Sequence, residues 1–323
     1  MKNNDQILNL FENYLAQMQF PEEPELLYKP ILYSMSGGGK RIRPTLLMLA
    51  CEAFGGDVQQ ALPAAAAVEM FHNFTLLHDD IMDNAEVRRG KPSVYASWGD
   101  NVAILSGDAM MIYSYRLLSE VPADKLARIM EIFTTTALQV CEGQQYDMDF
   151  ESMDSVAVED YILMIERKTS ALLSGSAMIG ATLAGAKDDD IKKLYRFATE
   201  LGLAFQLQDD MLDSFGDEAL GKRIGGDILE GKKTYLMVQA MSRASDEERE
   251  VLRTTHKNEA LSDAEKIATI KALYEKLDVK HATEQQIELR FERALSVLDT
   301  LSIGSERTVR LAEFARNLMG RKK

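Results

Sequence analysis

The 323-residue chain is acidic, with a formal net charge of −14 and a pI near 4.9. This charge argues against nucleic acid or an anionic membrane surface as a partner of the chain as a whole. The two cysteines, Cys51 and Cys141, lie ninety residues apart, which argues against a disulfide framework and a thiolate metal site and fits a reducing compartment. Because residues 1–17 lack the apolar core of a secretory signal, we expect a cytoplasmic protein.

Long helices are predicted for most of the chain. All seven prolines lie at or before Pro122, and a proline inside a helix costs on the order of 3 kcal/mol. Alternating β-branched runs are nearly absent, and helical patterns cover residues 62–83, 152–173, 197–215 and 281–301. Pro63 is predicted to stand in the first turn of the first of these helices. We therefore predict a single all-α domain spanning residues 1–323, a bundle of roughly ten or more helices.

Three glycine-containing segments are predicted to be loops: residues 36–39, 89–92 and 221–226. Residues 170–186 form a further distinctive segment, since they include no charged residue. They are short for a membrane span and rich in Ser, Gly and Ala, so we predict no span and a close approach of neighbouring helices there.

Two copies of the motif DDxxD end apolar helical segments: Asp79, Asp80 and Asp83 form the first, and Asp209, Asp210 and Asp213 the second. With 24 aspartates in the chain, only about 0.13 such motifs are expected by chance. In a helix the first and last Asp of a motif share a face, where two like charges about 4 Å apart cost roughly 4 kcal/mol. A hard cation relieves this repulsion, and Mg²⁺ typically binds one or two carboxylates together with phosphate oxygens. Two solvated acidic helix ends are the alternative.

Basic residues supply a possible anion site. Residues 37–44, with the sequence GGGKRIRP, form a glycine loop leading into a basic cluster, in which Lys40 and Arg43 would lie together if a helical turn began there. Arg88 and Arg89 follow the first aspartate motif. Backbone amides and guanidinium groups are suited to phosphate, although a surface loop is an equal alternative for residues 37–44 alone. A metal-bridged anion and a directly bound one imply two phosphorylated substrates.

Taken together, these segments resemble the trans-isoprenyl diphosphate synthase family, the polyprenyl synthetases. The resemblance runs from GGGKRIRP to EGKKT near residue 230 and includes, in order, LLHDDIMDNAEVRRG, GQQYDMDF with Gln144 and Asp147, ERKTSALL, FQLQDDMLD and GKRIGGDILEGKKT. It implies the class I terpenoid synthase fold around a central cavity. It also implies a homodimeric, Mg²⁺-dependent enzyme that joins isopentenyl diphosphate head-to-tail to an allylic diphosphate, giving a short all-trans product of C20 or C15.

The resemblance also implies a role for each matching residue. Asp79, Asp83 and Asp209 would be the main ligands of three Mg²⁺ ions, with Asp80, Asp210 and Asp213 in support. Arg88, Lys168, Lys222 and Lys232 would contact the allylic diphosphate. Lys40, Arg43, His72 and Arg89 would hold isopentenyl diphosphate without metal. Thr169 and Gln206, with the carbonyl of Lys168, would direct oxygen dipoles toward the allylic cation.

Product length is implied by the residues before the first aspartate motif. In the family, the residue five positions before the first Asp often closes the elongation pocket; here this is Phe74, followed by Thr75, with Phe71 as a second candidate. Core packing is an equal alternative for both phenylalanines. Bulky residues favour C15 or C20, and the absence of a two-residue insertion in the first motif favours C20.

Several alternatives stay open at this point. One is a longer-chain synthase, which would share all the motifs except the bulky pocket residues. Another is a non-catalytic helical partner subunit; such subunits usually lose one aspartate cluster, whereas this chain has both. The basic residues 321–323 resemble tails that help to close some family members, although a solubilising tail is an equal alternative.

Overall fold

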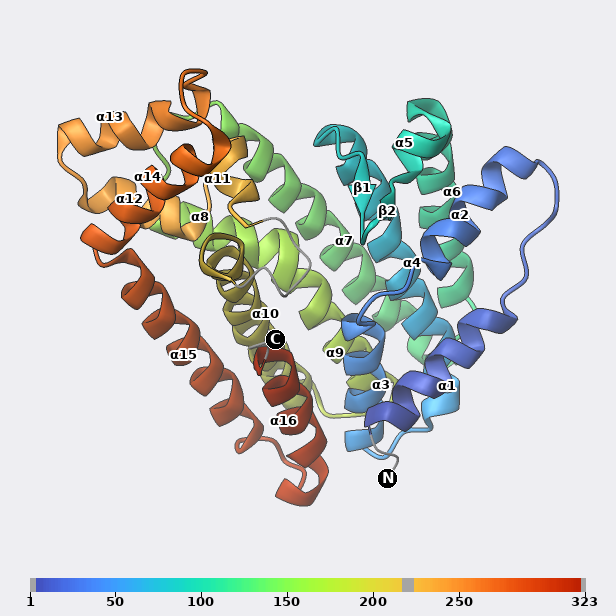
Figure 1. Cartoon of the computed structure of the whole chain (residues 1–323). Coiled ribbons are helices and arrows are strands. Elements are labelled where there is room, and N and C mark those ends of the chain that lie inside the picture. The colour runs from blue at the N-terminus through green and yellow to red at the C-terminus, as the bar shows by residue number, and fades with distance from the viewer. Residues whose placement is uncertain (1–3, 217–223, 321–323) are drawn as a thin grey trace. The chain divides into compact units, whose positions relative to one another are not determined.

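The computed structural model describes residues 4–216 and 224–320, and within these ranges it is almost entirely helical (Figure 1). The helices are α1 (Asn4–Gln17), α2 (Glu25–Ser36), α3 (Ile42–Ala53), α4 (Val58–Met82), α5 (Val94–Trp98), α6 (Asp100–Leu118), α7 (Ala123–Glu151), α8 (Val158–Ile165), the π-helix η1 (Glu166–Ser170), α9 (Ala171–Leu183), α10 (Asp188–Phe215), α11 (Gly226–Glu230), α12 (Tyr235–Arg243), α13 (Asp246–Thr254), the 3₁₀-helix η3 (Thr255–Lys257), α14 (Asp263–Lys276), α15 (Val279–Leu298) and α16 (Ser305–Met319). The all-α prediction is confirmed. A two-stranded hairpin, β1 (Val87–Arg88) and β2 (Lys91–Pro92), lies where a loop was predicted.

The helices form two compact units. The first comprises the described residues of Met1–Thr134, Gly175–Lys192 and Ser302–Leu311, and the second those of Thr135–Ser174, Lys193–Leu301 and Ala312–Lys323. Helices α7, α9, α10 and α16 contribute residues to both units. The single domain predicted for residues 1–323 stays a prediction.

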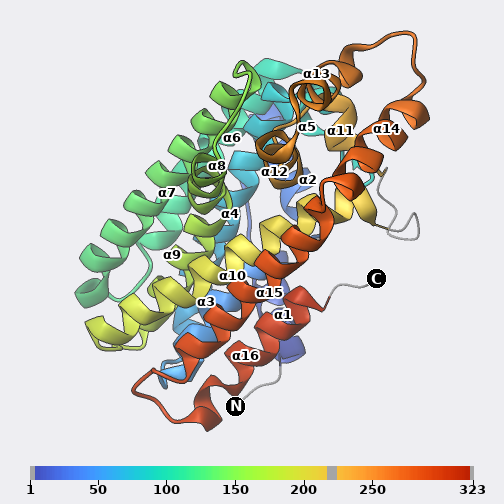
Figure 2. The ribbon, with the colours of Figure 1, turned by 90° about the vertical axis from the view of Figure 1, so that its left-hand side faces the viewer.

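Helix α4 is the centre of the first unit and packs against α3 and α6 (Figure 2). Residues 64–67, all alanine, are fully buried along it, because small side chains allow the neighbouring helices to approach closely. The helix begins at Val58, where the side chain of Asp57 caps it by accepting from the backbone N–H of Gln59. The predicted position of Pro63 in the first turn is therefore wrong, since this proline lies inside the helix.

The apolar segment 170–186 falls largely in α9. Within the first unit, a side chain at Gly180 would overlap the backbone carbonyl of Leu47 in α3, which confirms the predicted close approach of helices. In the described ranges, no helix combines the length and the apolar character that crossing a bilayer requires.

The second unit is organised around α10 and α15, which run alongside each other (Figure 2). The guanidinium of Arg290 in α15 forms an ion pair of 3.0 Å with Glu200 in α10. Helices α11 to α14 gather at one end of this unit, around a buried cluster that includes Leu236, Ile270 and Tyr274. A second buried cluster joins α8, α10 and α12 through Tyr161, Leu203, Leu207, Tyr235 and Val238.

Candidate active site

The first aspartate motif lies at the C-terminal end of α4, in the first unit. Asn84 has a left-handed backbone, with φ of 50°, and the N–H groups of Asn84 and Ala85 donate to the carbonyls of Ile81 and Asp80. This is a Schellman ending, with Asp83 at the C-cap. The carbonyl end of a helix carries partial negative charge, so carboxylates are disfavoured there. A cation or a basic side chain is needed to compensate.

Arg88 of strand β1 provides this compensation within the chain. Its Nε donates to Oδ1 of Asp80 at 2.7 Å, and its Nη2 lies 3.4 Å from Oδ2 of Asp79. The pKa of Arg88 is raised overall. Burial by itself lowers this pKa, but the hydrogen bond to Asp80 and the negative charges of Asp80 and Asp79 outweigh that effect. Burial raises the pKa of Asp80, which is 3% exposed, against the opposing effect of Arg88.

The hairpin turn separates the contacts of the consecutive residues Arg88 and Arg89. Arg89 and Gly90 have φ of 54° and 74°, the two positive values that a type I′ hairpin turn requires. While Arg88 contacts the aspartates, Arg89 donates through Nη1 to the carbonyl of Gly38. A Cβ on Gly39 would lie 3.1 Å from the Arg89 guanidinium. A glycine at position 39 therefore lets the guanidinium approach the loop backbone closely.

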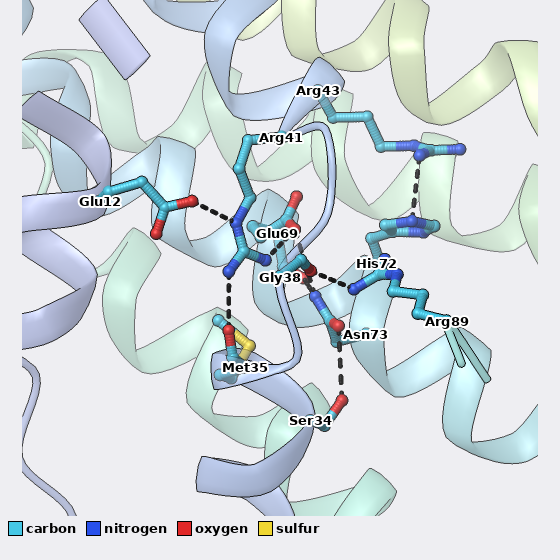
Figure 3. A network of polar contacts seen from close by, with 10 residues as sticks. All are labelled: Glu12, Ser34, Met35, Gly38, Arg41, Arg43, Glu69, His72, Asn73 and Arg89. Atoms are coloured by element: carbon cyan, nitrogen blue, oxygen red, sulfur yellow. Dashed lines mark hydrogen bonds and ion pairs between the residues drawn. The ribbon is translucent and has the colours of Figure 1, made fainter. Parts of the chain in front are cut away.

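Arg43 and His72 meet next to this loop (Figure 3). Nη1 of Arg43 lies 3.1 Å from Nε2 of His72, and because a guanidinium only donates, Nε2 is the acceptor and the imidazole is neutral. Burial, followed by the charges of Arg43 and Arg89, lowers the pKa of His72 well below its usual value. Burial also lowers the pKa of Arg43 to about 10. Within the described ranges the buried Nε of Arg43 has no hydrogen-bond partner, so this guanidinium keeps an unused donor.

Lys40 is exposed and lies before α3, which begins only at Ile42 after Arg41. The helical turn that would have joined Lys40 to Arg43 is therefore not formed. A cleft in the first unit nevertheless connects the glycine loop with the aspartate cluster, and its lining includes Gly37, Asn73, Asp80, Arg88 and Arg89.

The second aspartate motif lies in the last turns of α10, in the second unit. Asp210 is 4% exposed and accepts hydrogen bonds from the hydroxyl of Tyr161, from Nε2 of Gln206 at 2.9 Å and from the N–H of Tyr235 at 3.1 Å. Burial raises the pKa of Asp210 to about 6, although these hydrogen bonds lower it. With both oxygens engaged inside the unit, Asp210 has the geometry of a supporting residue. That assignment stays a prediction.

Asp213 connects the motif to α11 by accepting from the N–H of Asp227 at 3.1 Å. Burial, followed by the charges of Asp213 and Asp210, raises the pKa of Asp227 to about 7. Asp227 was not singled out in the sequence, although it lies in the segment GKRIGGDILEGKKT that carries part of the resemblance. Lys232 lies 2.8 Å from Glu230 and 4.0 Å from Asp227. Lys222 and the basic residues 321–323 lie outside the described residues.

A π-helix carries Lys168 and Thr169. Such wide turns are frequent at functional sites. Lys168 Nζ contacts Asp147 Oδ2 at 2.6 Å, and the hydroxyl of Thr169 donates to Oε1 of Gln206 at 2.9 Å. Because Gln206 also donates to Asp210, its amide has a fixed orientation. The opposing position in α7 must be glycine, since a side chain at Gly143 would overlap the backbone nitrogen of Lys168.

The candidate chain-length residues lie in an aromatic cluster of the first unit. Phe71 and Phe74 are buried, with ring centroids 5.4 Å apart, and Phe71 also lies 5.4 Å from Phe133. Tyr115 packs on Phe133 at 5.5 Å. The hydroxyl of Thr75 donates to the carbonyl of His72. Phe133 and Tyr115 were missed, because their segments are distant in sequence from the aspartate motif.

Among residues 4–216 and 224–320, no group of three or more His, Cys, Asp and Glu side chains converges as a metal cage would require. Each aspartate motif supplies carboxylate oxygens, the protein ligands that Mg²⁺ takes together with phosphate oxygens and water. The donor set consists of oxygens alone, which suits Mg²⁺ better than a softer metal.

Known proteins resemble this chain over most of its length. The family model described as Polyprenyl synthetase matches residues 24–277. Geranylgeranyl diphosphate synthase from Methanosarcina mazei is 44% identical over 223 residues, 68% of this chain and 69% of that protein. Geranylgeranyl pyrophosphate synthase from Geoglobus acetivorans is 39% identical over 310 residues, 94% and 95% of the two chains. A crystal structure of geranylgeranyl pyrophosphate synthase superimposes with a TM-score of 0.94 at 42% identity, covering 100% of both chains.

Proposed function

Because the chain belongs to the polyprenyl synthetase family, we propose that it condenses isopentenyl diphosphate head-to-tail with an allylic diphosphate to form C20 geranylgeranyl diphosphate. One observation supports this proposal: the first unit contains both a carboxylate cluster and a cationic group, and α4 contributes Asp79 to the first and His72 to the second. The carboxylates at the end of α4 suit a metal-bound diphosphate, and the cationic group of Arg43, His72 and Arg89 suits a diphosphate bound without metal.

Mg²⁺ fits the residues present, since both motifs supply carboxylate oxygens, the hard ligands that this ion takes together with phosphate and water. We propose that Asp79, Asp83 and Asp209 hold three such ions. When bound, they supply Lewis-acid stabilisation of the charge on the departing diphosphate. Arg88, Lys168, Lys222 and Lys232 are the proposed direct contacts of the same diphosphate.

The chain's own groups have distinct proposed tasks. Arg43, Arg89 and Lys40 bind isopentenyl diphosphate. Neutral His72 accepts from Arg43 at Nε2, which places its ring proton on Nδ1 as a donor. Gln206 and Thr169, together with the carbonyl of Lys168, direct oxygen dipoles toward the allylic cation. The proton lost after the new bond forms goes to the released diphosphate, so a protein base is not required.

We propose that Phe71 and Phe74, supported by Phe133 and Tyr115, close the elongation pocket and limit the product to C20. Their mutual packing supports this role, because a ring held between other rings cannot easily turn aside for a longer chain. Thr75, which is half-buried, is the proposed neighbour of the growing chain.

A second copy of this chain is the proposed partner. Helix α6 exposes Ile104, Leu105 and Ile112, which are 43%, 60% and 65% exposed, and such a row of apolar side chains is typical of a covered helix face. A cytoplasmic location is part of the same proposal, in keeping with two unpaired cysteines.

The test is a product analysis. The protein is incubated with Mg²⁺, labelled isopentenyl diphosphate and either dimethylallyl, geranyl or farnesyl diphosphate, and the C20 product is expected. No product with any of these primers would refute the enzyme assignment. A C15 product, or one of C30 or longer, would refute the proposed pocket.

A further inference from the structure

Arg41, between the proposed ligands Lys40 and Arg43, makes a buried set of contacts that leaves it no access to a substrate. Its side chain is 2% exposed, and it donates to Oε1 of Glu69 at 2.7 Å, to Oε1 of Glu12 at 2.9 Å and to the carbonyl of Met35 at 2.7 Å (Figure 3). Its backbone is left-handed, with φ of 45°, at the N-cap of α3. This is a strained conformation for a residue other than glycine. The guanidinium contacts therefore hold a bend that the backbone alone would not favour.

Glu69 is the buried partner on α4. Its side chain is 3% exposed, and besides Arg41 it accepts from Nδ2 of Asn73 at 3.3 Å. Asn73 in turn accepts from the hydroxyl of Ser34 in α2, at 3.4 Å. Glu69 thus joins α4 to both ends of the glycine loop, through Ser34 before it and Arg41 after it.

The charge of Glu69 also acts on the neighbouring arginines. Burial lowers the pKa of both Arg43 and Arg89, and the carboxylate of Glu69 raises the pKa of each. Glu69 therefore supplies negative charge next to Arg43 and Arg89, whose positive charges would otherwise repel each other before an anion binds. His72 lies three residues after Glu69 on α4, nearly one helical turn away.

We infer that Glu69 and Arg41 form a positioning pair that holds the glycine loop and the Arg43–His72 contact in the geometry that binds the metal-free diphosphate. The inference rests on the proposed function and assigns a role to two residues that do not touch substrate. The pair joins the start of α3, which carries Arg43, to the part of α4 that carries His72. Loss of Arg41 leaves the buried carboxylate of Glu69 without its ion-pair partner, and loss of Glu69 leaves Arg41 with only the half-exposed Glu12 as a carboxylate partner among the described residues. Either change is expected to move the loop.

Glu69→Gln separates this role from simple electrostatics. The change keeps the shape of the side chain and removes its charge. If Glu69 positions the loop, the KM for isopentenyl diphosphate rises about tenfold, the effect of replacing a hydrogen bond between two charged groups by a weaker one to a neutral amide. The KM for the allylic diphosphate then stays within about twofold, because Glu69 lies beside the residues proposed to bind the metal-free diphosphate and away from the aspartates. If Glu69 only reduces the positive potential, its removal lowers the KM for isopentenyl diphosphate, and that result overturns the inference.

The chain offers a matched control. Glu52 of α3 pairs with Arg310 at 2.9 Å, also within the first unit and also largely buried, and it lies ten residues after the start of α3 at Ile42. Glu52→Gln should change neither KM selectively. An equal rise of both KM values in Glu69→Gln would mean a general structural role and would overturn the inference.

Two further variants keep the test decisive if Glu69→Gln does not fold. Arg41→Lys keeps the charge but cannot reach three acceptors, so the same selective rise in KM is expected. Glu69→Asp keeps the charge on a shorter side chain and should recover part of the affinity. If neither change affects the KM for isopentenyl diphosphate, the inference is overturned. A wild-type protein inactive with every primer would instead refute the proposed function.

Discussion

Replacing Asp210 by Asn should make the stability difference between variant and wild type depend strongly on pH. In the folded protein burial raises the pKa of Asp210 from 3.8 to about 6. At about 1.4 kcal/mol per pH unit, this difference corresponds to about 3 kcal/mol. Because the folded protein keeps this proton to higher pH than the unfolded chain, Asp210 stabilises the fold below about pH 4 and loses that contribution as the pH rises through about 6.

Asn does not titrate, so the free energy of unfolding of Asp210→Asn should gain about 3 kcal/mol relative to wild type between pH 4 and pH 7. Chemical denaturation at pH 4, 5, 6 and 7, without Mg²⁺, measures this difference. Tyr161→Phe is the companion variant. It removes the hydroxyl that lowers the pKa of Asp210, so the pH-dependent loss should extend above pH 6. A difference between Asn and wild type that stays constant across the range would refute the assignment of Asp210 as a buried, proton-retaining carboxylate.

Three further changes test a proposed metal ligand, the proposed pocket wall and the packing beside Lys168. Asp79→Ala should abolish turnover while the far-ultraviolet circular dichroism stays unchanged, because the residue is near a helix end; retained turnover would contradict its role as a metal ligand. Phe74→Ala should lengthen the main product beyond C20 in the labelled-substrate assay, whereas an unchanged product length would place the pocket wall elsewhere. Gly143→Ala should destabilise the second unit by about 1–3 kcal/mol or more, since its methyl group would overlap the backbone nitrogen of Lys168, and thermal unfolding measures the loss.

The sequence was sufficient for the all-α fold and for which segments carry chemistry, because both depend on local patterns. Helical periodicity and the lack of proline after Pro122 are read along the chain, and so are the two aspartate motifs. The position of Pro63 shows the limit of this approach. Its preference for a first turn is a local average, and α4, capped by Asp57, begins four residues before the predicted start at residue 62.

Contacts between distant segments could not be predicted. Arg41 and Glu69 are 28 residues apart, and no spacing rule connects them. Phe133 and Tyr115 join Phe71 only because α4, α6 and α7 pack together. The hairpin at residues 87–92 has two-residue strands, too short for an alternating pattern, so only Gly90 in its turn marked it in the sequence.

Helix α4 sets the spacing between the two proposed diphosphate sites. His72 and Asp79 are seven residues apart on one continuous helix, which corresponds to about 10 Å along the axis and a rotation only about 20° short of two full turns. Both side chains therefore face nearly the same direction, with room for one diphosphate at each. Glu69 lies one further turn toward the N-terminus, where it can fix the metal-free site without approaching the aspartates. One inserted residue between His72 and Asp79 would rotate the aspartates by about 100° relative to the histidine, so the two substrates could no longer be presented to each other, although both groups of ligands would remain.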